Sequence, residues 1–129
     1  MAFRESFSSE PKIILPAAYK FNSYLTLLEG KRVALIVNHS SLVGSVHLVD
    51  TLLKKSIKIV KIFAPEHGFR GDVEAGAAID NQVDLKTRIP IISIYGKKSK
   101  PSSEDLKNVD CILFDIQDVG VRFFTYIST

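Results

Sequence analysis

The sequence predicts an α/β fold, an open and mostly parallel Rossmann-like sheet with flanking helices. Four short apolar runs have the length and composition of buried strands, and segments with helical spacing or longer connections separate them. Runs that are apolar on both faces are typical of parallel strands covered by helices. The alternation of helices and strands favours right-handed crossovers within one sheet.

The expected elements follow one another along the chain. A first helix is expected over residues 17–28, with Pro16 at its start and Gly30 just past its end. The remaining expected elements are a strand at 32–38, a helix at 46–53, strands at 57–63 and 91–94, a short helix from Ser102 or Ser103 through Leu106, and a strand at 111–115.

Length and composition predict one domain. The chain has 129 residues, 46% of them hydrophobic and 24% charged, which suffices for one core. Residues 1–16 are expected to form an N-terminal arm, and residues 17–129 the Rossmann-like domain. The apolar run 121–127 has no helix stop signal. It predicts that the domain is incomplete, that a C-terminal domain follows in a longer protein, and that this surface self-associates.

Several functional classes are not favoured. The net charge is only +3, without aromatic residues among the lysines, so nucleic acid is not an expected partner. No apolar run is long enough to span a bilayer, and no secretion signal is present. Nucleotide-binding glycine motifs are absent, so we expect no cofactor. We expect no metal either, because HxH and HExxH spacings are absent and His47 falls within an expected helix; Cys111 is expected to be buried.

Polar residues gather where the expected strands end. In open α/β sheets, ligands bind outside the carboxyl ends of the strands. The 27 residues from Ala64 to Pro90 form a connection longer than a plain strand–helix loop, which is typical of a functional segment. Within it, Glu66 could act as a general acid if a partly apolar cleft raises its pKa, or it could cap or pair in a surface loop. His67 could bind a ligand, carry a proton or pack structurally.

The last expected strand also ends in polar residues. Asp115 could be a second catalytic group or an acceptor for a sugar hydroxyl, and Asp118 could do the same or cap the next helix. Arg122 could hold an anionic substrate group or pair with Asp118. The sequence leaves open whether the strands before Glu66 and Asp115 are adjacent.

Four motifs in order resemble the N-terminal part of the bacterial exo-β-N-acetylmuramidases, the NamZ or YbbC-like family long classed as a domain of unknown function. The resemblance runs from about Leu28 to Thr129. It rests on the segments 30–38 (GKRVALIVN), 63–71 (FAPEHGFRG), 90–96 (PIISIYG) and 114–129 (FDIQDVGVRFFTYIST).

This resemblance implies a glycoside hydrolase that removes N-acetylmuramic acid from the non-reducing end of peptidoglycan fragments, in the periplasm or outside the cell. It implies Glu66 as the catalytic acid, and the residues that it implies as lining the pocket are Asn38, His67, Arg70, Asp115, Gln117 and Arg122. The strand-end pattern adds Asp115 as the second catalytic group and Asp118 as a further substrate-binding residue. The alternative hypotheses are a non-catalytic sugar-binding or structural half-domain and, third, a metal-dependent hydrolase.

Overall fold

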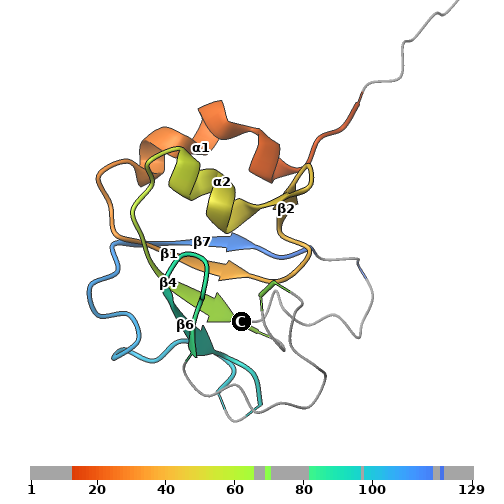
Figure 1. Cartoon of the computed structure of the whole chain (residues 1–129). Coiled ribbons are helices and arrows are strands. Elements are labelled where there is room, and N and C mark those ends of the chain that lie inside the picture. The colour runs from red at the N-terminus through yellow and green to blue at the C-terminus, as the bar shows by residue number, and fades with distance from the viewer. Residues whose placement is uncertain (1–12, 66–68, 71–81, 97, 118–119, 121–129) are drawn as a thin grey trace, which may run out of the picture.

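The computed structural model describes residues 13–65, 69–70, 82–96, 98–117 and 120. In this part of the chain, a five-stranded sheet has the order β5-β6-β4-β1-β7, and β2 and β3 form a separate hairpin (Figure 1). The strands are β1 (Val33–Val37), β2 (Leu42–Val43), β3 (Val46–His47), β4 (Ile59–Ala64), β5 (Gln82–Val83), β6 (Pro90–Ser93) and β7 (Cys111–Asp115). The helices are the 3-10 helix η1 (Ala17–Tyr19) and the α-helices α1 (Phe21–Leu28) and α2 (Leu48–Lys54).

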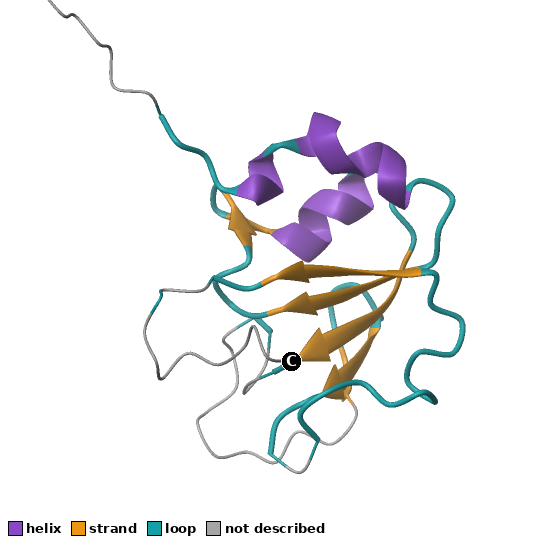
Figure 2. Ribbon diagram, turned by 180° about the vertical axis from the view of Figure 1, so that it is seen from behind, coloured by secondary structure: helices purple, strands orange, loops and turns teal. Residues whose placement is uncertain are grey.

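The sheet confirms the predicted Rossmann-like α/β architecture. Strands β6, β4, β1 and β7 pair in parallel, and the edge strand β5 pairs antiparallel to β6. Figure 2 shows the described helices grouped on one side of this sheet. No helix in the described residues is long and apolar enough to cross a membrane.

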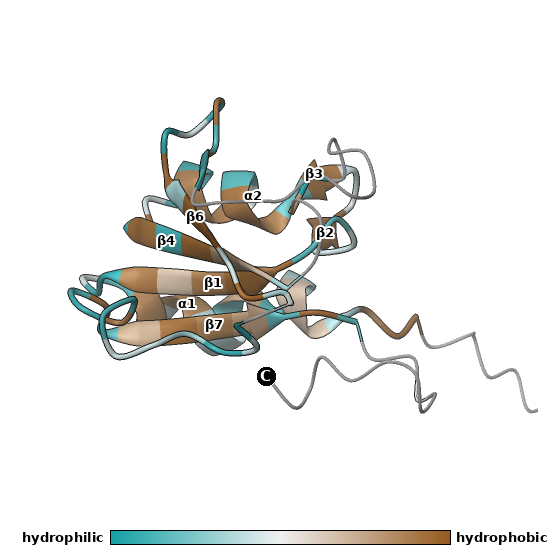
Figure 3. Cartoon of the chain, turned by 90° about the horizontal axis from the view of Figure 1, so that it is seen from below, coloured by the Kyte–Doolittle hydropathy of each residue, from teal (hydrophilic) through white to brown (hydrophobic). Residues whose placement is uncertain are grey.

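Strand β1 is the centre of the core and is buried on both faces, as its apolar sequence predicts. Val33, Leu35 and Val37 belong to the larger cluster beneath the helices. Ala34 and Ile36 face the other way and pack with Phe63 and Ile94. Figure 3 shows hydrophobic colour along the length of β1. Burial of both faces fixes where the polar residues after this strand emerge.

The first helix is interrupted, so its prediction as one element over 17–28 was wrong. Lys20 lies between η1 and α1 with φ −84° and ψ 55°, outside the helical region. Its main-chain N–H donates to the carbonyl of Ala17 at 2.9 Å and closes the 3-10 turn. The hydroxyl of Tyr24 donates to the carbonyl of Ala18 at 2.7 Å, which holds η1 against α1.

The second helix begins later than predicted because its expected start belongs to a hairpin. Val43 pairs with Val46 across a turn in which Gly44 has φ 63°, a conformation that glycine adopts without strain. His47 therefore lies at the N-cap of α2 and not within a helix. Strand β5 is a second short element that was not predicted, within the connection from 64 to 90.

The predicted helix through Leu106 is a series of turns. The carboxylate of Asp105 accepts a hydrogen bond from the main-chain N–H of Ser102 at 2.7 Å and pairs with Lys98. Asn108 then takes a left-handed φ of 62°, which does not continue a helix. Cys111 was expected to be buried, but it is only half-buried because β7 is an edge strand of the described sheet.

The order of the strands settles which strand ends are adjacent. Phe63 of β4 and Phe114 of β7 both pair with Ile36, so β1 separates these two strands. With about 4.8 Å between neighbouring strands, the backbones of β4 and β7 are roughly 10 Å apart. Asp115 and the residues after β4 thus emerge from the same edge of the sheet, on either side of β1.

Candidate functional site

The predicted site residues fall into three groups. Asn38, Arg70 and Asp115 are described and lie after or at the ends of β1, β4 and β7, and Gln117 is described and exposed. Glu66, His67, Asp118 and Arg122 lie outside the described residues. The geometry of the site is therefore built from the first group and its neighbours.

Asn38 forms the turn that leaves β1. It is 6% exposed, and its side-chain oxygen accepts hydrogen bonds from the main-chain N–H of Ser40 at 3.0 Å and from its hydroxyl at 2.7 Å. The hydroxyl of Ser41 accepts from the main-chain N–H of Asn38 at 3.1 Å and donates to the main-chain carbonyl of Asp115. The turn after β1 is thus tied to the end of β7.

His47 was not among the predicted site residues, yet it links the strand end to α2. Its Nε2 lies 2.9 Å from the carbonyl of Asn38, and its Nδ1 accepts from the main-chain N–H of Val49 at 3.3 Å. These contacts fit the neutral tautomer with the proton on Nε2. Burial lowers the pKa of His47, and the positive charge of Arg70 lowers it further. The hydrogen bond to the carbonyl of Asn38 acts in the opposite direction but does not outweigh these two effects.

Phe69 anchors the chain shortly after β4. Its side chain is 2% exposed and meets the ring of His47 edge-on, with 5.0 Å between ring centroids and 78° between planes. The guanidinium of Arg70 lies over the Phe69 ring at 4.7 Å from its centroid. Pro65, the residue directly after β4, is buried as well.

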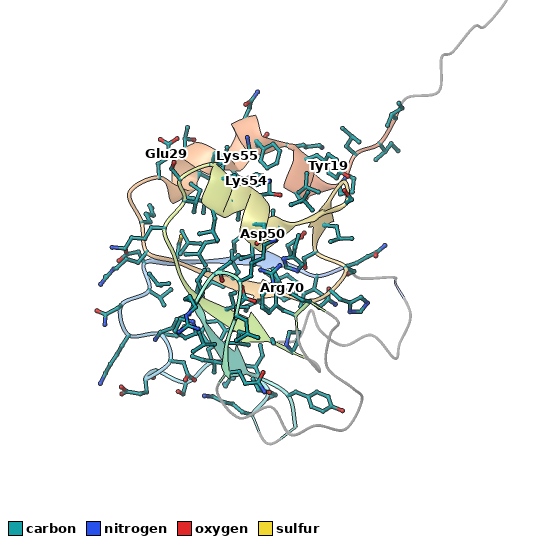
Figure 4. The ribbon with its side chains drawn as sticks, viewed as in Figure 1. Tyr19, Glu29, Asp50, Lys54, Lys55 and Arg70 are labelled. Carbon is teal, nitrogen blue, oxygen red and sulfur yellow. The ribbon has the colours of Figure 1, made fainter. Side chains whose placement is uncertain are left out.

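Arg70 binds two carboxylates at once. Its Nη1 and Nη2 donate to Asp50 at 2.9 and 3.0 Å, and its Nε and Nη2 donate to Asp84 at 2.9 Å each. Figure 4 shows Arg70 beneath α2, the helix that carries Asp50. The side chains of Asp50 and Asp84 are only 9% and 6% exposed, so this is a buried ion-pair cluster.

Mutual stabilisation holds all three of these groups charged. The hydrogen bond from Arg70 lowers the pKa of Asp50 to about 2, against the opposing effect of burial, and Lys86 adds to the lowering. Burial acts to raise the pKa of Asp84, but the hydrogen bonds from Arg70 and Thr87 outweigh it and lower this pKa. The hydrogen bond to Asp84 raises the pKa of Arg70.

A polar cavity of about 340 Å³ lies beside this cluster. Its lining residues are His39, Leu42, Ser45, Val46, His47, Asp50, Arg70 and Lys86. The described residues contain no group of three or more histidine, cysteine, aspartate or glutamate side chains arranged to hold a metal ion.

Asp115 has a different environment. It is half-buried beside a second cavity of about 200 Å³, which lies between the helix layer and β7. Burial raises the pKa of its carboxyl, and the attraction of His47 only partly offsets this effect. A half-buried carboxyl with a raised pKa can exchange a proton nearer to neutral pH than an ordinary aspartate.

The fold and these strand-end residues define a class: an α/β domain with a Rossmann-like sheet whose polar residues collect at the carboxyl edge. Residues 33–129 match the family described as exo-beta-N-acetylmuramidase NamZ, N-terminal. The chain belongs to this family, which confirms the resemblance seen in the sequence.

The chain spans less than a third of the length of each of three similar proteins. The chain is 44% identical over 124 residues to the peptidoglycan beta-N-acetylmuramidase NamZ of Bacillus subtilis, a match that covers 95% of the chain and 30% of that protein. Crystal structures of two DUF1343 family proteins from Bacteroides fragilis are similar with a TM-score of 0.71 each. They are 43% and 41% identical, over 86% and 83% of this chain and 28% and 27% of theirs.

Sequence reasoning missed His47, Asp50 and Asp84. A hydrogen-bond acceptor directly before an apolar helix could have indicated the N-cap role of His47. The carboxylates that bind Arg70 lie 20 and 14 positions away, and no short motif joins them.

Proposed function

We propose that this chain supplies part of the active site of an exo-β-N-acetylmuramidase, which removes N-acetylmuramic acid from the non-reducing end of peptidoglycan fragments. The observation that carries the proposal is the 44% identity, over 95% of the chain, to a peptidoglycan beta-N-acetylmuramidase. The described geometry supports it, because a half-buried carboxyl with a raised pKa lies at the same edge of the sheet as the end of β4, the strand that precedes Glu66 in the sequence.

Within this proposal, Glu66 is the general acid that protonates the leaving oxygen, and Asp115 is the second carboxyl. Glycosidases commonly use two carboxyl groups on either side of the scissile bond. Glu66 follows the buried Pro65 in the sequence, and Phe69, also buried, comes three positions later. Positioning of an acid beside the scissile bond makes it a more effective catalyst.

The other predicted residues have proposed roles around the substrate. Asn38, through its buried turn, would shape the pocket floor, while His67 and Gln117 would donate hydrogen bonds to sugar oxygens. Asp118 would accept a hydrogen bond from a sugar hydroxyl, and Arg122 would bind the lactyl carboxylate of N-acetylmuramic acid. Arg70 already binds two carboxylates, so its proposed contribution is to hold the pocket wall.

Hydrolysis of para-nitrophenyl N-acetylmuramide tests this function. A protein that combines this chain with the rest of the active site should release nitrophenol, and Glu66→Gln should reduce the rate by about a hundredfold or more, as expected for the loss of a general acid. Glu29→Gln, a matched change at the exposed end of α1, should leave the rate unchanged.

Two results would contradict the proposal. Equal rates for the chain and Glu66→Gln would remove Glu66 from its role. Binding of the muramide without release of nitrophenol would favour a non-catalytic sugar-binding domain, which is the second candidate because the chain spans only 30% of the length of the curated relative.

A further inference from the structure

The cavity beside Asp115 is small and has mainly apolar walls. It has a volume of about 200 Å³. The residues that line it are Ala17, Ala18, Tyr24, Leu48, Leu113, Phe114 and Asp115. Sites for drug-sized ligands usually measure about 300–1,000 Å³, so this cavity fits one substituent of a sugar better than a whole oligosaccharide.

The walls of this cavity are held by the core. Leu48 is 1% exposed and Ala18 is 7% exposed, and both belong to the main hydrophobic cluster. Leu113 packs against the same cluster. Such walls favour a methyl group, whose burial contributes roughly 0.8 kcal/mol.

Two polar side chains line the cavity, and they differ in what they can offer. Tyr24 already donates its hydroxyl proton to the carbonyl of Ala18 at 2.7 Å. None of the contacts among the described residues is a hydrogen bond to the Asp115 carboxyl. No fully buried side-chain oxygen in this part of the chain lacks a hydrogen-bond partner, so the unpartnered carboxyl oxygens of Asp115 are accessible from the cavity. A matching ligand group therefore combines a methyl with a hydrogen-bond donor.

We propose that this cavity is a subsite for the acetamido group of an N-acetylated amino sugar, with the methyl against Ala18 and Leu48 and the amide N–H donating to Asp115. The inference rests on the proposed function, since N-acetylmuramic acid carries one such group. The lactyl group of the same sugar carries a carboxylate, which would be repelled by the Asp115 carboxylate, so the cavity discriminates between the two substituents by charge.

The first test maps binding on the 129-residue chain by methyl-resolved NMR, with N-acetylglucosamine as the probe and glucose as its counterpart without the acetamido group. N-acetylglucosamine should shift the methyl signals of Ala17, Ala18, Leu48 and Leu113 in a saturable way, and glucose should not. Unchanged methyl signals, or equal shifts with both sugars, would overturn the subsite.

The second test uses variants. Asp115→Leu replaces the carboxylate with an apolar side chain of similar size and so removes the acceptor, and it should weaken binding of N-acetylglucosamine at least tenfold, as expected for losing a hydrogen bond to a charged group. Ala17→Leu should weaken it by filling the cavity. Ser45→Leu adds an apolar side chain at the other cavity and should bind as the unmodified chain does. Unchanged affinity in Asp115→Leu and Ala17→Leu, with intact methyl spectra, would contradict the assignment.

These results separate the subsite from the muramidase activity. Hydrolysis of the muramide without shifts at the four methyl-bearing residues would leave the proposed function standing and refute the subsite. Shifts at those residues without hydrolysis would support an acetamido subsite in a domain that binds amino sugars, and would refute the muramidase activity of this chain.

Discussion

Two carboxylate environments lie under the same helix layer and differ in almost every respect. Asp50 and Asp84 bind the guanidinium of Arg70, and their pKa values are lowered. The side-chain carboxyl of Asp115 accepts no hydrogen bond among the described residues, and burial raises its pKa. The comparison shows that burial alone does not decide the charge of a carboxyl, because a positioned cation can outweigh it.

The difference also distinguishes carboxylates with a structural role from a carboxyl with a proposed functional role. The Arg70 cluster stabilises the fold around Phe69 and the chain that follows β4. An unpartnered half-buried carboxyl is costly to the fold, which is typical of groups retained for binding or catalysis. The comparison therefore predicts opposite effects on stability for changes at the two places.

The largest expected effect comes from breaking the cluster at its centre. Arg70→Met should lower the free energy of unfolding by about 3–5 kcal/mol, because it leaves two buried carboxylates without their shared cation. Urea denaturation measures this loss. Arg32→Met is the matched control, since Arg32 pairs with Asp110 at an exposed site where 41% and 38% of the two side chains are accessible. Equal losses in the two variants would contradict the structural role of the cluster.

Acid should weaken the same cluster. The pKa of Asp50 is 3.8 when unperturbed and about 2 in the fold. Its ionised form therefore stabilises the fold by about 2 kcal/mol above pH 5, and this contribution disappears as the pH falls toward 2. Asp50→Asn should show a flatter dependence of stability on pH in that range. A variant profile that runs parallel to that of the unmodified chain would show that Asp50 is not the titrating group.

His47 lies between the two environments and should respond at higher pH. Its lowered pKa means that the unfolded chain takes up a proton more readily than the folded one, so His47 reduces stability as the pH falls below about 6.5. His47→Gln should cost about 1 kcal/mol at pH 7 through the lost N-cap and hydrogen bond. The melting temperature should fall less between pH 7 and pH 5 in the variant than in the unmodified chain. An equal fall in both proteins would exclude His47 as the source of this pH dependence.

The smallest expected effect has the opposite sign. Asp115→Asn removes a charge that burial disfavours, so it should raise the free energy of unfolding at pH 7, by on the order of 0.5 kcal/mol. The gain should vanish below pH 3.8, where the aspartate is protonated in both states. Asp84→Asn is the matched comparison, and it should lower the free energy of unfolding because it removes a carboxylate that binds Arg70. A loss of stability in Asp115→Asn would mean that this carboxyl is paired in the fold.

The sequence predicts the sheet better than its surroundings for a physical reason. Continuous apolar runs such as β1 are buried on both faces, and that pattern is local in the sequence. The hairpin of β2 and β3 has two residues per strand, too few for a period-two pattern to appear. The neighbours of β1 also could not be predicted, because pairing of parallel strands depends on contacts between segments far apart in the chain.

The residues of the candidate site also differ in how far the sequence could predict them. Asn38 and Asp115 could be selected from the sequence because both follow or end apolar runs. Arg70 was selected from its motif, but its partners lie on α2 and after β5 and only the fold brings them together. The predicted roles of all the site residues stay predictions: Asn38, Glu66, His67, Arg70, Asp115, Gln117, Asp118 and Arg122.

A carbon-detected NMR titration of the aspartate carboxyl groups tests the contrast between the two environments most directly. The account predicts that, in the same sample, Asp50 titrates at about 2 and Asp115 titrates above its ordinary value of 3.8. An Asp115 pKa at or below 3.8 would show that its carboxyl is solvated or paired, and would contradict both its proposed catalytic role and the acetamido subsite.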